Sequence, residues 1–364
     1  MKPILVCGLE HLIAKTARHY HMLSNILGTD VIIYSRDISN LSTKFAINYG
    51  LTWYKVPIGK YADIKTFTLL IRKYKPIHIE IYHDTQSDLV HVGYLLVAIA
   101  HHIPVVVFCR GGELYYWDRH TIRKKIGIWL GLKLSKLVLY KEIFMLQKLK
   151  KLNIKPDKIV FFYNRIPVLQ QEPPDVSHRL GVLYLNTFKP FRHPDIVVEV
   201  ATRIAKQFPS VCFTIAGDRY FKNGHISLPQ LEKTVNEKGL VNRISFLGWV
   251  TEPEVLYRTH CIFLLPAEHV FLNYSLLEAM ERGLVPVVAT SPGAEIIIEH
   301  GKDGMIVDLD ADAFTTAVSY LLSHPNVLSQ MAKNAREKVK SCFDLRLGLQ
   351  GLVRVYQQKV WKKK

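Results

Sequence analysis

The strongest constraint on the fold is an end-to-end alternation of short β-branched runs with longer segments of helical periodicity. This alternation is typical of α/β folds, in which helices cross over between parallel strands. In the first half the expected strands are Ile4–Cys7, Val31–Tyr34, Thr52–Lys55, Ile77–Tyr82, Val105–Phe108, Leu137–Leu139 and Ile159–Phe162. The second half restarts the pattern with Gly181–Leu185, Val211–Ala216, Ile244–Leu247, Cys261–Leu265, Val285–Ala289 and Gly304–Val307. The sequence therefore predicts two doubly wound, Rossmann-like α/β domains.

The chain has 364 residues, a length that suits about two domains. The point at which the strand and helix pattern begins again places a domain boundary near the middle of the chain. A stretch rich in proline and polar residues precedes the second series of strands, which is typical of a linker. We expect an N-terminal domain at 1–168, a linker at 169–178 and a C-terminal domain at 179–344. Residues 345–364 are expected to form a helix that packs back toward the N-terminal domain. Ligands of open α/β sheets bind beyond the carboxyl ends of the strands, and we expect both domains to offer these ends to a central cleft.

Positive charge is concentrated in the N-terminal half. The formal net charge is +17, and residues 1–168 hold 25 of the 48 Lys and Arg but 11 of the 31 Asp and Glu, a balance of +14. A helical segment near 117–133 interleaves the run Arg123-Lys124-Lys125 with isoleucines, leucines and Trp129. A basic amphipathic helix with a Trp is typical of contact with an anionic membrane surface, whereas the alternative is a core-facing helix with a solvated basic face.

Other features of the sequence narrow the cellular compartment and the partners that can be expected. The five cysteines are widely spaced, form no Cys-x-x-Cys pair and favour buried, reduced thiols in a cytoplasmic protein. The N-terminus reads as a first strand rather than a signal peptide. The longest apolar stretch, Val90 to Cys109, contains histidines and Pro104, so a helix and a strand are expected there instead of a membrane span. The basic clusters accompany no groove-reading or stacking motif, so no nucleic-acid partner is expected.

The segment from Cys261 to Val307 carries the clearest signal for a binding site. A buried strand is expected to end at Pro266, and a helix carries Ser275 to Arg282. The free N–H groups and the dipole at the start of such a helix favour a phosphate. Glu278, near the start of this helix, can accept both hydroxyls of a ribose diol, or can merely complement the helix dipole.

The same segment resembles the C-terminal signature of retaining glycosyltransferases of the GT-B fold, family 4. The residues that carry the likeness are Pro266, Leu276-Leu277-Glu278-Ala279-Met280, Gly283, Pro286–Thr290, Gly293, Glu295–Ile297 and the turn Gly301 to Gly304. Further pieces follow in family order along nearly the whole chain, at Tyr163–Pro167, Ile215–Asp218 and Ile244–Val250. The resemblance implies transfer of a hexose from a nucleoside diphosphate sugar, with retention of the anomeric configuration.

The resemblance also implies roles for strand-end residues of the C-terminal domain. The donor diphosphate would be bound by Lys189, Arg192, Asn273, Tyr274 and Ser275. Glu278 would hold the ribose, and the base would be lined by Leu247, Gly248, Trp249 and Val250. No metal and no separate cofactor are implied, because fixed cations and N–H dipoles stabilise the charge of the leaving diphosphate.

Two departures from the family pattern affect these roles. The alignment on Asp195 puts Arg192 at the family's Lys position, whereas Thr187 stands at the family's Arg position and leaves Lys189 as the nearest replacement. The family also pairs its ribose glutamate with a second glutamate near the donor sugar, and that position holds Val270.

The missing glutamate leaves two substitutes open. Glu268, two residues before the family position, can reach the sugar through a shifted loop, and we predict it as a catalytic residue. The other substitute is the side-chain amide of Asn273.

Candidates in the N-terminal domain follow the strands expected at 77–82 and 105–108. Arg110 precedes Gly111-Gly112, two glycines that allow the backbone close to the donor, and Arg110 or Glu113 would replace a histidine common in the family. His83 is a further candidate to face the sugar or acceptor, although a lone histidine is more often a structural hydrogen-bonding group.

The run Asp308, Asp310 and Asp312 resembles a metal-binding motif but precedes a helix expected over 311–323, whose N–H groups it can cap. The resemblance, taken with the charge pattern, implies a cytoplasmic glycosyltransferase, peripherally associated with the inner face of the membrane, that acts on a lipid-linked or cell-surface glycan acceptor. Two alternatives remain open: a non-catalytic nucleotide-sugar-binding homologue and a GT-B nucleotide-sugar epimerase.

Overall fold

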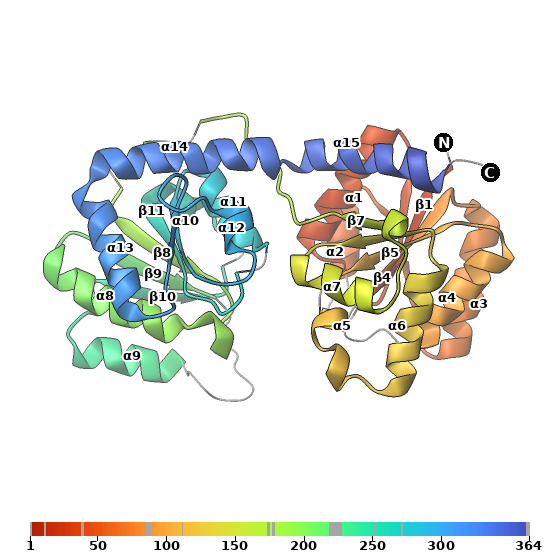
Figure 1. Ribbon diagram of the computed structural model, residues 1–364, viewed down its shortest axis with the longest axis horizontal. Helices are drawn as coiled ribbons and strands as arrows, with labels where there is room; N and C mark the ends of the chain where they lie inside the picture. The colour runs from red at the N-terminus through yellow and green to blue at the C-terminus, as the bar shows by residue number, and fades with distance from the viewer. Residues whose placement is uncertain are drawn as a thin grey trace. The chain divides into compact units, whose positions relative to one another are not determined.

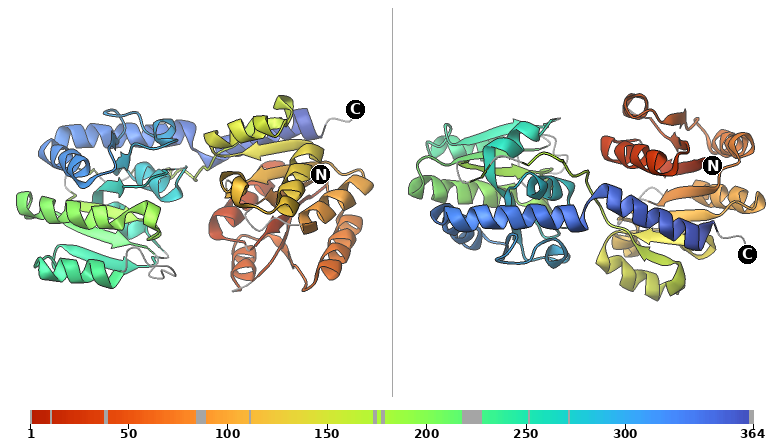
Figure 2. Two further views of the ribbon diagram at one scale, coloured as in Figure 1. Left: turned by 60° about the horizontal axis from the view of Figure 1, so that its bottom comes forward. Right: turned by 90° about the horizontal axis from the view of Figure 1, so that it is seen from above.

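The computed structural model describes residues 2–10, 12–37, 40–83, 89–110, 112–172, 175–176, 179–217, 228–250, 252–270 and 272–361. The chain forms two compact units, one of Met1–Tyr163 with Leu345–Lys364 and one of Asn164–Asp344 (Figure 1). Each unit is a parallel sheet with helices on both faces, as Figure 2 shows. The predicted fold class, two doubly wound α/β domains, is confirmed.

The first unit contains a seven-stranded sheet in the order β3-β2-β1-β4-β5-β6-β7. Its strands are β1 (Ile4–Leu9), β2 (Val31–Ser35), β3 (Thr52–Lys55), β4 (His78–His83), β5 (Val105–Cys109), β6 (Leu137–Tyr140) and β7 (Ile159–Phe161). The inner strands are almost wholly buried, because helices cover both faces, and this is why they read as continuous apolar runs.

The helices of this unit are α1 (Ala14–Leu27), α2 (Leu41–Asn48), α3 (Lys60–Tyr74), α4 (Leu89–Ala100), α5 (Gly112–Tyr115), α6 (Ile122–Leu134), α7 (Ile143–Lys151) and α15 (Leu345–Val355), with short turns at Trp117–Arg119, Pro156–Lys158 and Tyr356–Val360. The helix expected near 117–133 begins at Ile122, because the Thr121 hydroxyl accepts the N–H of Lys124 and caps it there. The sequence predicts helices near 11–26, 61–74, 87–101, 117–133 and 142–150, and it predicts none at 41–48, where α2 lies.

The second unit contains a six-stranded sheet in the order β10-β9-β8-β11-β12-β13. Its strands are β8 (Gly181–Leu185), β9 (Cys212–Ala216), β10 (Ile244–Gly248), β11 (His260–Leu265), β12 (Val285–Ala289) and β13 (Met305–Val307). Its helices are α8 (Pro194–Gln207), α9 (Leu228–Glu237), α10 (Glu254–Thr259), α11 (Tyr274–Glu281), α12 (Ala294–Ile297), α13 (Ala311–Ser323) and α14 (Pro325–Cys342), with a turn at Pro190–Arg192. All thirteen strands of the two sheets start within one residue of their predicted starts.

Two smaller expectations have clear outcomes. Asp310 caps α13 as predicted, since its side chain accepts the N–H of Ala313 at 2.8 Å. Three of the free cysteines are buried, but the expectation of burial is wrong for Cys212 and Cys342, which are exposed because they lie at the start of β9 and the end of α14.

Among the residues described, no helix combines the length and the apolar character needed to cross a bilayer.

Part of the segment expected as a linker lies against the second unit. The Leu169 N–H donates to Glu281 at 2.9 Å, and the Arg336 guanidinium donates to the Gln171 carbonyl at 2.9 Å. Pro173, Pro174, Ser177 and His178 of this segment lie outside the described residues.

The order of the second sheet fixes where a ligand can bind in that unit. After β8 the chain adds β9 and β10 on one side, and it then returns to add β11 on the other side of β8. The connections that follow β8 and β11 therefore leave neighbouring strands in opposite directions. Such a switch point opens a crevice at the carboxyl ends of the strands.

The C-terminal segment is anchored to the first unit around a buried carboxylate on β4. Glu80 accepts hydrogen bonds from the hydroxyls of Tyr20 at 2.5 Å and Tyr356 at 2.7 Å. The Nε2 atom of His78 lies 3.2 Å from the same carboxylate, and Trp361 donates to Nδ1 of His78 at 3.0 Å. Because an indole N–H can only donate, the His78 proton must lie on Nε2, facing Glu80.

These contacts keep the carboxylate ionised. Burial raises the pKa of Glu80, but the hydrogen bonds from His78, Tyr20 and Tyr356 outweigh burial and hold this pKa below its ordinary value. The carboxylate therefore contributes stability that is present above the pKa of the unfolded state and is lost as pH falls through the folded-state pKa.

We expect the substitution Tyr356→Phe to lower the free energy of unfolding by about 1.5–3 kcal/mol, because Glu80 loses a hydrogen bond to a charged, buried acceptor. Urea denaturation followed by circular dichroism measures the change. Tyr320→Phe is the matched control, since Tyr320 is 43% exposed. Equal destabilisation by the two substitutions would show that the Tyr356 hydroxyl does not hold the C-terminal segment.

Candidate active site

Two loops of the second unit meet at the switch point between β8 and β11. The N–H of Glu268, after β11, donates to the carbonyl of Phe191, after β8, at 3.1 Å. In the opposite sense, the Arg192 guanidinium donates through Nη1 to the carbonyl of His269 at 3.0 Å. These two bonds bring together Arg192 and Glu268, two predicted site residues that are far apart in the sequence.

Arg192 is half-buried and held through its backbone as well as its side chain. Its N–H donates to the Lys189 carbonyl at 2.8 Å, and its own carbonyl accepts the hydroxyl of the buried Tyr184 at 3.3 Å. The guanidinium lies 5.3 Å from the ring centroid of Phe191, and the ammonium of Lys189 lies 5.9 Å from the same centroid. Both predicted cations therefore sit on one short turn at the strand ends, as a diphosphate site requires.

Glu268 offers an accessible carboxylate on this loop. Its side chain is 53% exposed, and Oε1 lies 3.4 Å from Nε2 of His193. His193 starts α8 in the left-handed conformation, with φ of 41°. Val270, at the family's glutamate position, is fully buried, and its N–H donates to the Ser291 hydroxyl at 3.1 Å. A side chain at position 270 thus faces the interior, while the carboxylate two residues earlier reaches solvent.

Helix α11 begins beside this loop with a capped N-terminus. The side-chain oxygen of Asn273 accepts the N–H of Leu276 at 3.1 Å, so this oxygen serves the helix. Tyr274 and Ser275 form the first turn, and both are half-buried. The loop that accepts the Arg192 hydrogen bond at His269 leads along the chain into this helix.

Glu278 lies on the first turns of α11 and is half-buried. One of its oxygens accepts the hydroxyl of Tyr257, on α10, at 3.0 Å. Burial and the charge of Glu278 raise the pKa of Tyr257 well above its ordinary value, so this tyrosine stays a neutral donor. Tyr257 thereby orients the carboxylate predicted to hold a ribose, a role that the sequence reading missed.

The predicted base-lining residues are the last two of β10, Leu247 and Gly248, and the two that follow it, Trp249 and Val250. Leu247 is 44% exposed and Trp249 is 70% exposed, while Gly248 between them is buried and takes a positive φ of 65°. The Gly248 carbonyl accepts the N–H of Gly217 at 2.7 Å, which ties the end of β9 to this loop. Val250 is half-buried. Asp218, which completes the family's Ala-Gly-Asp piece, lies outside the described residues.

Asn186 is a second residue that the sequence reading left without a role. It directly follows β8, and its Oδ1 accepts the N–H of Thr187 at 2.9 Å. Its Nδ2 is buried, and no acceptor for it is found among the described residues. This buried amide lies at the carboxyl end of β8, where a ligand of an open α/β sheet binds, and its position directly after a strand is the signal that could have found it.

The two candidates of the first unit lie at the carboxyl ends of neighbouring strands. The N–H of Arg110, after β5, donates to the carbonyl of His83, the last residue of β4, at 3.4 Å. The His83 side chain is buried, packed so closely on Gly131 that a Cβ there would overlap its ring. Burial and the nearby His91 lower the pKa of His83 to about 3, so its ring is neutral. Gly111 lies outside the described residues.

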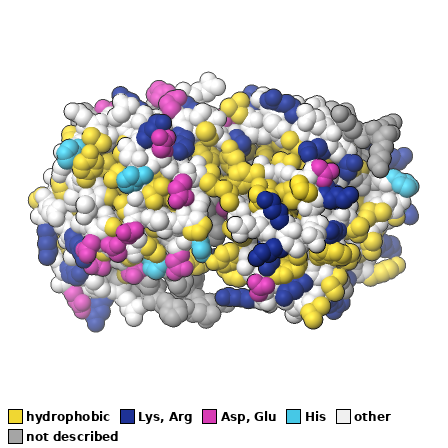
Figure 3. All heavy atoms as spheres, in the orientation of Figure 1, with side chains coloured by type: hydrophobic (Ala, Val, Ile, Leu, Met, Phe, Trp, Pro, Cys, Tyr) yellow, Lys and Arg dark blue, Asp and Glu magenta, His cyan; other side chains and the backbone are white. Residues whose placement is uncertain are grey.

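Helix α6 presents the predicted basic surface. Arg123 is exposed, and Lys124 and Lys125 are half-buried. On the same helix Ile122, Ile126 and Trp129 are 77%, 50% and 39% exposed, at a spacing that places them on one face. Figure 3 shows Lys and Arg side chains next to hydrophobic ones over the first unit.

Comparison with known proteins finds glycosyltransferases similar to this chain. Residues 179–324, within the second unit, match the family described as glycosyl transferases group 1. The Escherichia coli UDP-Gal:alpha-D-GlcNAc-diphosphoundecaprenol alpha-1,3-galactosyltransferase is 24% identical over 311 residues, which cover 79% of this chain and 78% of that protein. A solved glycosyltransferase from Rickettsia africae superposes with a TM-score of 0.82 at 15% identity, covering 100% of this chain and 99% of that one.

The chain is a GT-B glycosyltransferase. A second solved structure, HepE of Anabaena in complex with UDP, superposes on this glycosyltransferase with a TM-score of 0.80 at 14% identity, covering 98% of this chain and 100% of that one. The predicted fold and enzyme class are confirmed. The roles of the individual site residues stay predictions.

The close approach of Gly217 to the end of β8 gives a test of the site's backbone. A Cβ at position 217 would overlap the Asn186 carbonyl oxygen, which is backbone and cannot rotate away. We expect Gly217→Ala to destabilise the glycosyltransferase by about 2 kcal/mol or more, as overpacking does, and to weaken nucleotide binding. Differential scanning fluorimetry with and without nucleotide measures both effects.

Gly351→Ala on α15 is the control, because a Cβ there meets no atom within 4 Å. It should leave nucleotide binding intact and stabilise the helix by up to about 1 kcal/mol. Normal stability and nucleotide binding in Gly217→Ala would contradict the described contact between the ends of β8 and β9.

Proposed function

We propose that this glycosyltransferase retains the anomeric configuration and transfers a hexose from a nucleoside diphosphate sugar to a lipid-linked or cell-surface glycan acceptor. The observation that carries the donor class is the pair of hydrogen bonds that joins the loops after β8 and β11 and so brings Arg192 to the loop that leads into α11. The E. coli relative is named for a UDP-sugar donor and a diphosphoundecaprenol-linked acceptor. A relative from Rhizobium meliloti is named as a lipopolysaccharide core biosynthesis glycosyltransferase, 26% identical over 31% of this chain.

The donor diphosphate would lie between the turn of Lys189 and Arg192 and the N-terminus of α11. When the sugar departs, negative charge develops on the leaving phosphate oxygen. A fixed guanidinium and oriented N–H groups stabilise this charge without reorganisation, and we propose that they do so without a divalent metal. The buried amide of Asn186 supplies a further donor at the same strand ends.

The nucleoside would extend from the diphosphate toward α10 and the end of β10. Glu278, oriented by Tyr257, would accept the ribose hydroxyls. Leu247 and Trp249 expose apolar surface on which a base can rest, and the Gly248 bend leaves room for it.

The sugar would lie near Glu268, whose carboxylate is accessible on the joined loop. We propose that Glu268 replaces the glutamate absent at Val270 and binds the donor sugar close to the reacting carbon. In the first unit Arg110 is proposed to face the sugar or acceptor. The neutral, buried His83 would act through its carbonyl, which fixes the backbone of Arg110.

We also propose that the enzyme attaches to the inner face of the cytoplasmic membrane through α6. The Ile122, Ile126 and Trp129 face would enter the interface, and the run Arg123-Lys124-Lys125 would contact anionic headgroups. An acceptor anchored to lipid makes such attachment useful, because enzyme and acceptor then share a surface.

We expect Arg192→Ala to lower kcat by about 100-fold or more, since one preorganised donor to the leaving group is lost. The assay follows nucleoside diphosphate release from UDP-, GDP- and dTDP-sugars with a lipid-linked acceptor present or omitted. Arg203→Ala, which removes an exposed cation of α8 paired with Glu199, should leave kcat nearly unchanged. Unchanged turnover in Arg192→Ala would reject the assignment of Arg192.

The same assay separates the two alternative functions. Turnover of the nucleotide sugar that needs no acceptor indicates an epimerase. Thermal stabilisation by nucleotide without any turnover indicates a non-catalytic binding protein.

We expect the triple variant Arg123→Gln, Lys124→Gln, Lys125→Gln to bind vesicles with anionic lipid at least tenfold more weakly at low salt, at about 1 kcal/mol per cation. Sedimentation with vesicles at two salt concentrations measures binding, and the difference should shrink at high salt. Lys150→Gln with Lys151→Gln, two exposed lysines of α7, is the control. Equal vesicle binding by the triple variant and the wild type would refute attachment through α6.

A further inference from the structure

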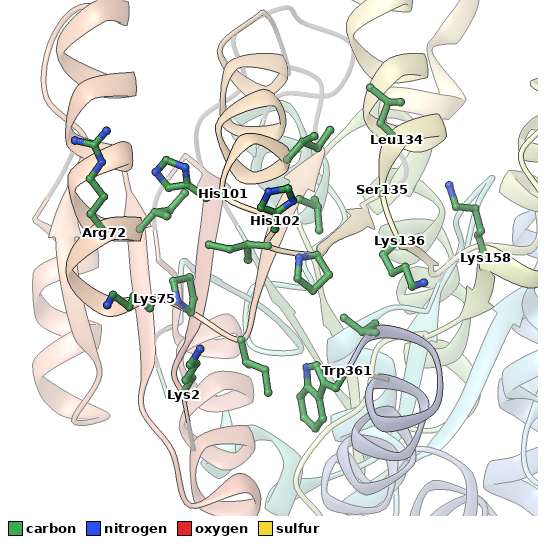
Figure 4. A pocket seen from close by; sticks show the side chains of 18 residues that line it. Lys2, Arg72, Lys75, His101, His102, Leu134, Ser135, Lys136, Lys158 and Trp361 are labelled. Carbon is green, nitrogen blue, oxygen red and sulfur yellow. The ribbon is translucent and has the colours of Figure 1, made fainter. Parts of the chain in front are cut away.

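A cavity of about 1100 Å³ opens at the amino edge of the first sheet (Figure 4). Its walls come from the ends of α3, α4 and α6 and from the residues that lead into β4, β5 and β6. Arg110 and His83 lie at the other ends of β5 and β4. The cavity is therefore distinct from the strand ends at which the first unit is proposed to contact the sugar or acceptor.

The side chains described around the cavity include several cations and no carboxylate. Its lysine and arginine residues are Lys2, Arg72, Lys75, Lys136 and Lys158, with His101 and His102 beside them. Figure 4 shows Arg72 and Lys75 on one side and Lys136 and Lys158 on the opposite side. Burial, together with the neighbouring Lys155, Lys133 and Lys136, lowers the pKa of Lys158 in spite of the opposing effect of Asp157.

The helix ends at this edge do not account for so many cations. α3, α4 and α6 all finish here, and each C-terminus carries about half a negative charge that a nearby cation can complement. Three such ends amount to about −1.5, against five Lys and Arg side chains. Roughly three positive charges are left for a ligand, and their positions on opposite sides suit an anion placed between them.

The cavity also has apolar walls that reach the surface. Ile99 on α4 and Leu134, the last residue of α6, line it and are 44% and 48% exposed. Leu134 belongs to the same helix as Ile126 and Trp129, whose exposed face is proposed to enter the membrane. A small inorganic anion would leave this apolar surface uncovered, whereas an amphiphile with an anionic head would cover it.

We propose that the cavity binds the phosphate headgroup of an anionic phospholipid. Arg72 and Lys75 from one side and Lys136 and Lys158 from the other contact the phosphate oxygens, and Ile99 and Leu134 contact the first carbons of the lipid. The proposal rests on the proposed membrane attachment through α6, to which it adds a specific lipid site at the C-terminal end of that helix.

The test uses the double variant Arg72→Gln with Lys136→Gln, two exposed residues from opposite sides of the cavity that should be replaceable without loss of folding. The control is Lys150→Gln with Lys151→Gln, which removes the same charge from α7, outside the cavity. The full-length enzyme is titrated with dihexanoyl phosphatidic acid below its micelle concentration, with inorganic phosphate and with a short oligonucleotide. Thermal shift reports binding.

We expect dihexanoyl phosphatidic acid to stabilise the wild type and the α7 control, and the cavity variant to bind it at least tenfold more weakly. Inorganic phosphate and the oligonucleotide should act much more weakly on all three proteins. Equal affinity of the cavity variant and the control for the lipid would overturn the proposal. Equal stabilisation by inorganic phosphate or by the oligonucleotide would also overturn it, because the site would then recognise free phosphate or a nucleic acid.

Vesicle sedimentation separates this proposal from the attachment on which it rests. If the α6 triple variant fails to bind vesicles while the cavity variant binds like the wild type, attachment stands and the lipid site is refuted. If the wild type does not bind anionic vesicles at all, attachment itself is refuted.

Discussion

The candidate donor site depends on two hydrogen bonds that cross between loops. The Glu268 N–H donates to the Phe191 carbonyl, and the Arg192 guanidinium donates to the His269 carbonyl. Each loop alone would be a polar connection after a strand. Joined, they fix a cation and an accessible carboxylate at one switch point, on the loop that leads into α11, and this arrangement suits a departing diphosphate. The reversal of strand order between β8 and β11 is what allows both loops to lie at this place.

In the first unit, the charged and titratable residues at the carboxyl ends of the strands differ from those at the amino ends. At the carboxyl ends, His83 is neutral and buried while Arg110 stays half-buried beside it. At the amino ends, cations outnumber the helix termini that they could complement. A balance of +14 in residues 1–168 indicated only that this half attracts anions, and the fold divides that charge between α6 and a separate cavity.

The sequence predicted the strands well, but it missed one helix and misplaced the start of another. The inner strands of the two sheets were found because buried parallel strands read as continuous apolar runs, and the more exposed edge strands β3, β7, β10 and β13 were found from their β-branched and aromatic residues. Helix α2 was missed, and α6 began later than expected because a Thr121 cap fixes its start. At the site, the family likeness indicated Arg192 and Glu278, but Tyr257 and Asn186 were missed. Tyr257 acts through a contact 21 positions away, which no local pattern reveals.

The sequence by itself determined the fold class, the enzyme class and the segments that could carry chemistry, because periodicity and local motifs depend on neighbours along the chain. Only the tertiary structure decided which of those segments meet. It placed position 270 in the core and Glu268 at the surface, and it buried His83 against Gly131. It also attached the C-terminal segment to the first unit through the hydrogen bond from Tyr356 to Glu80. These outcomes depend on packing between residues far apart in the chain, and a linear pattern contains no record of those distances.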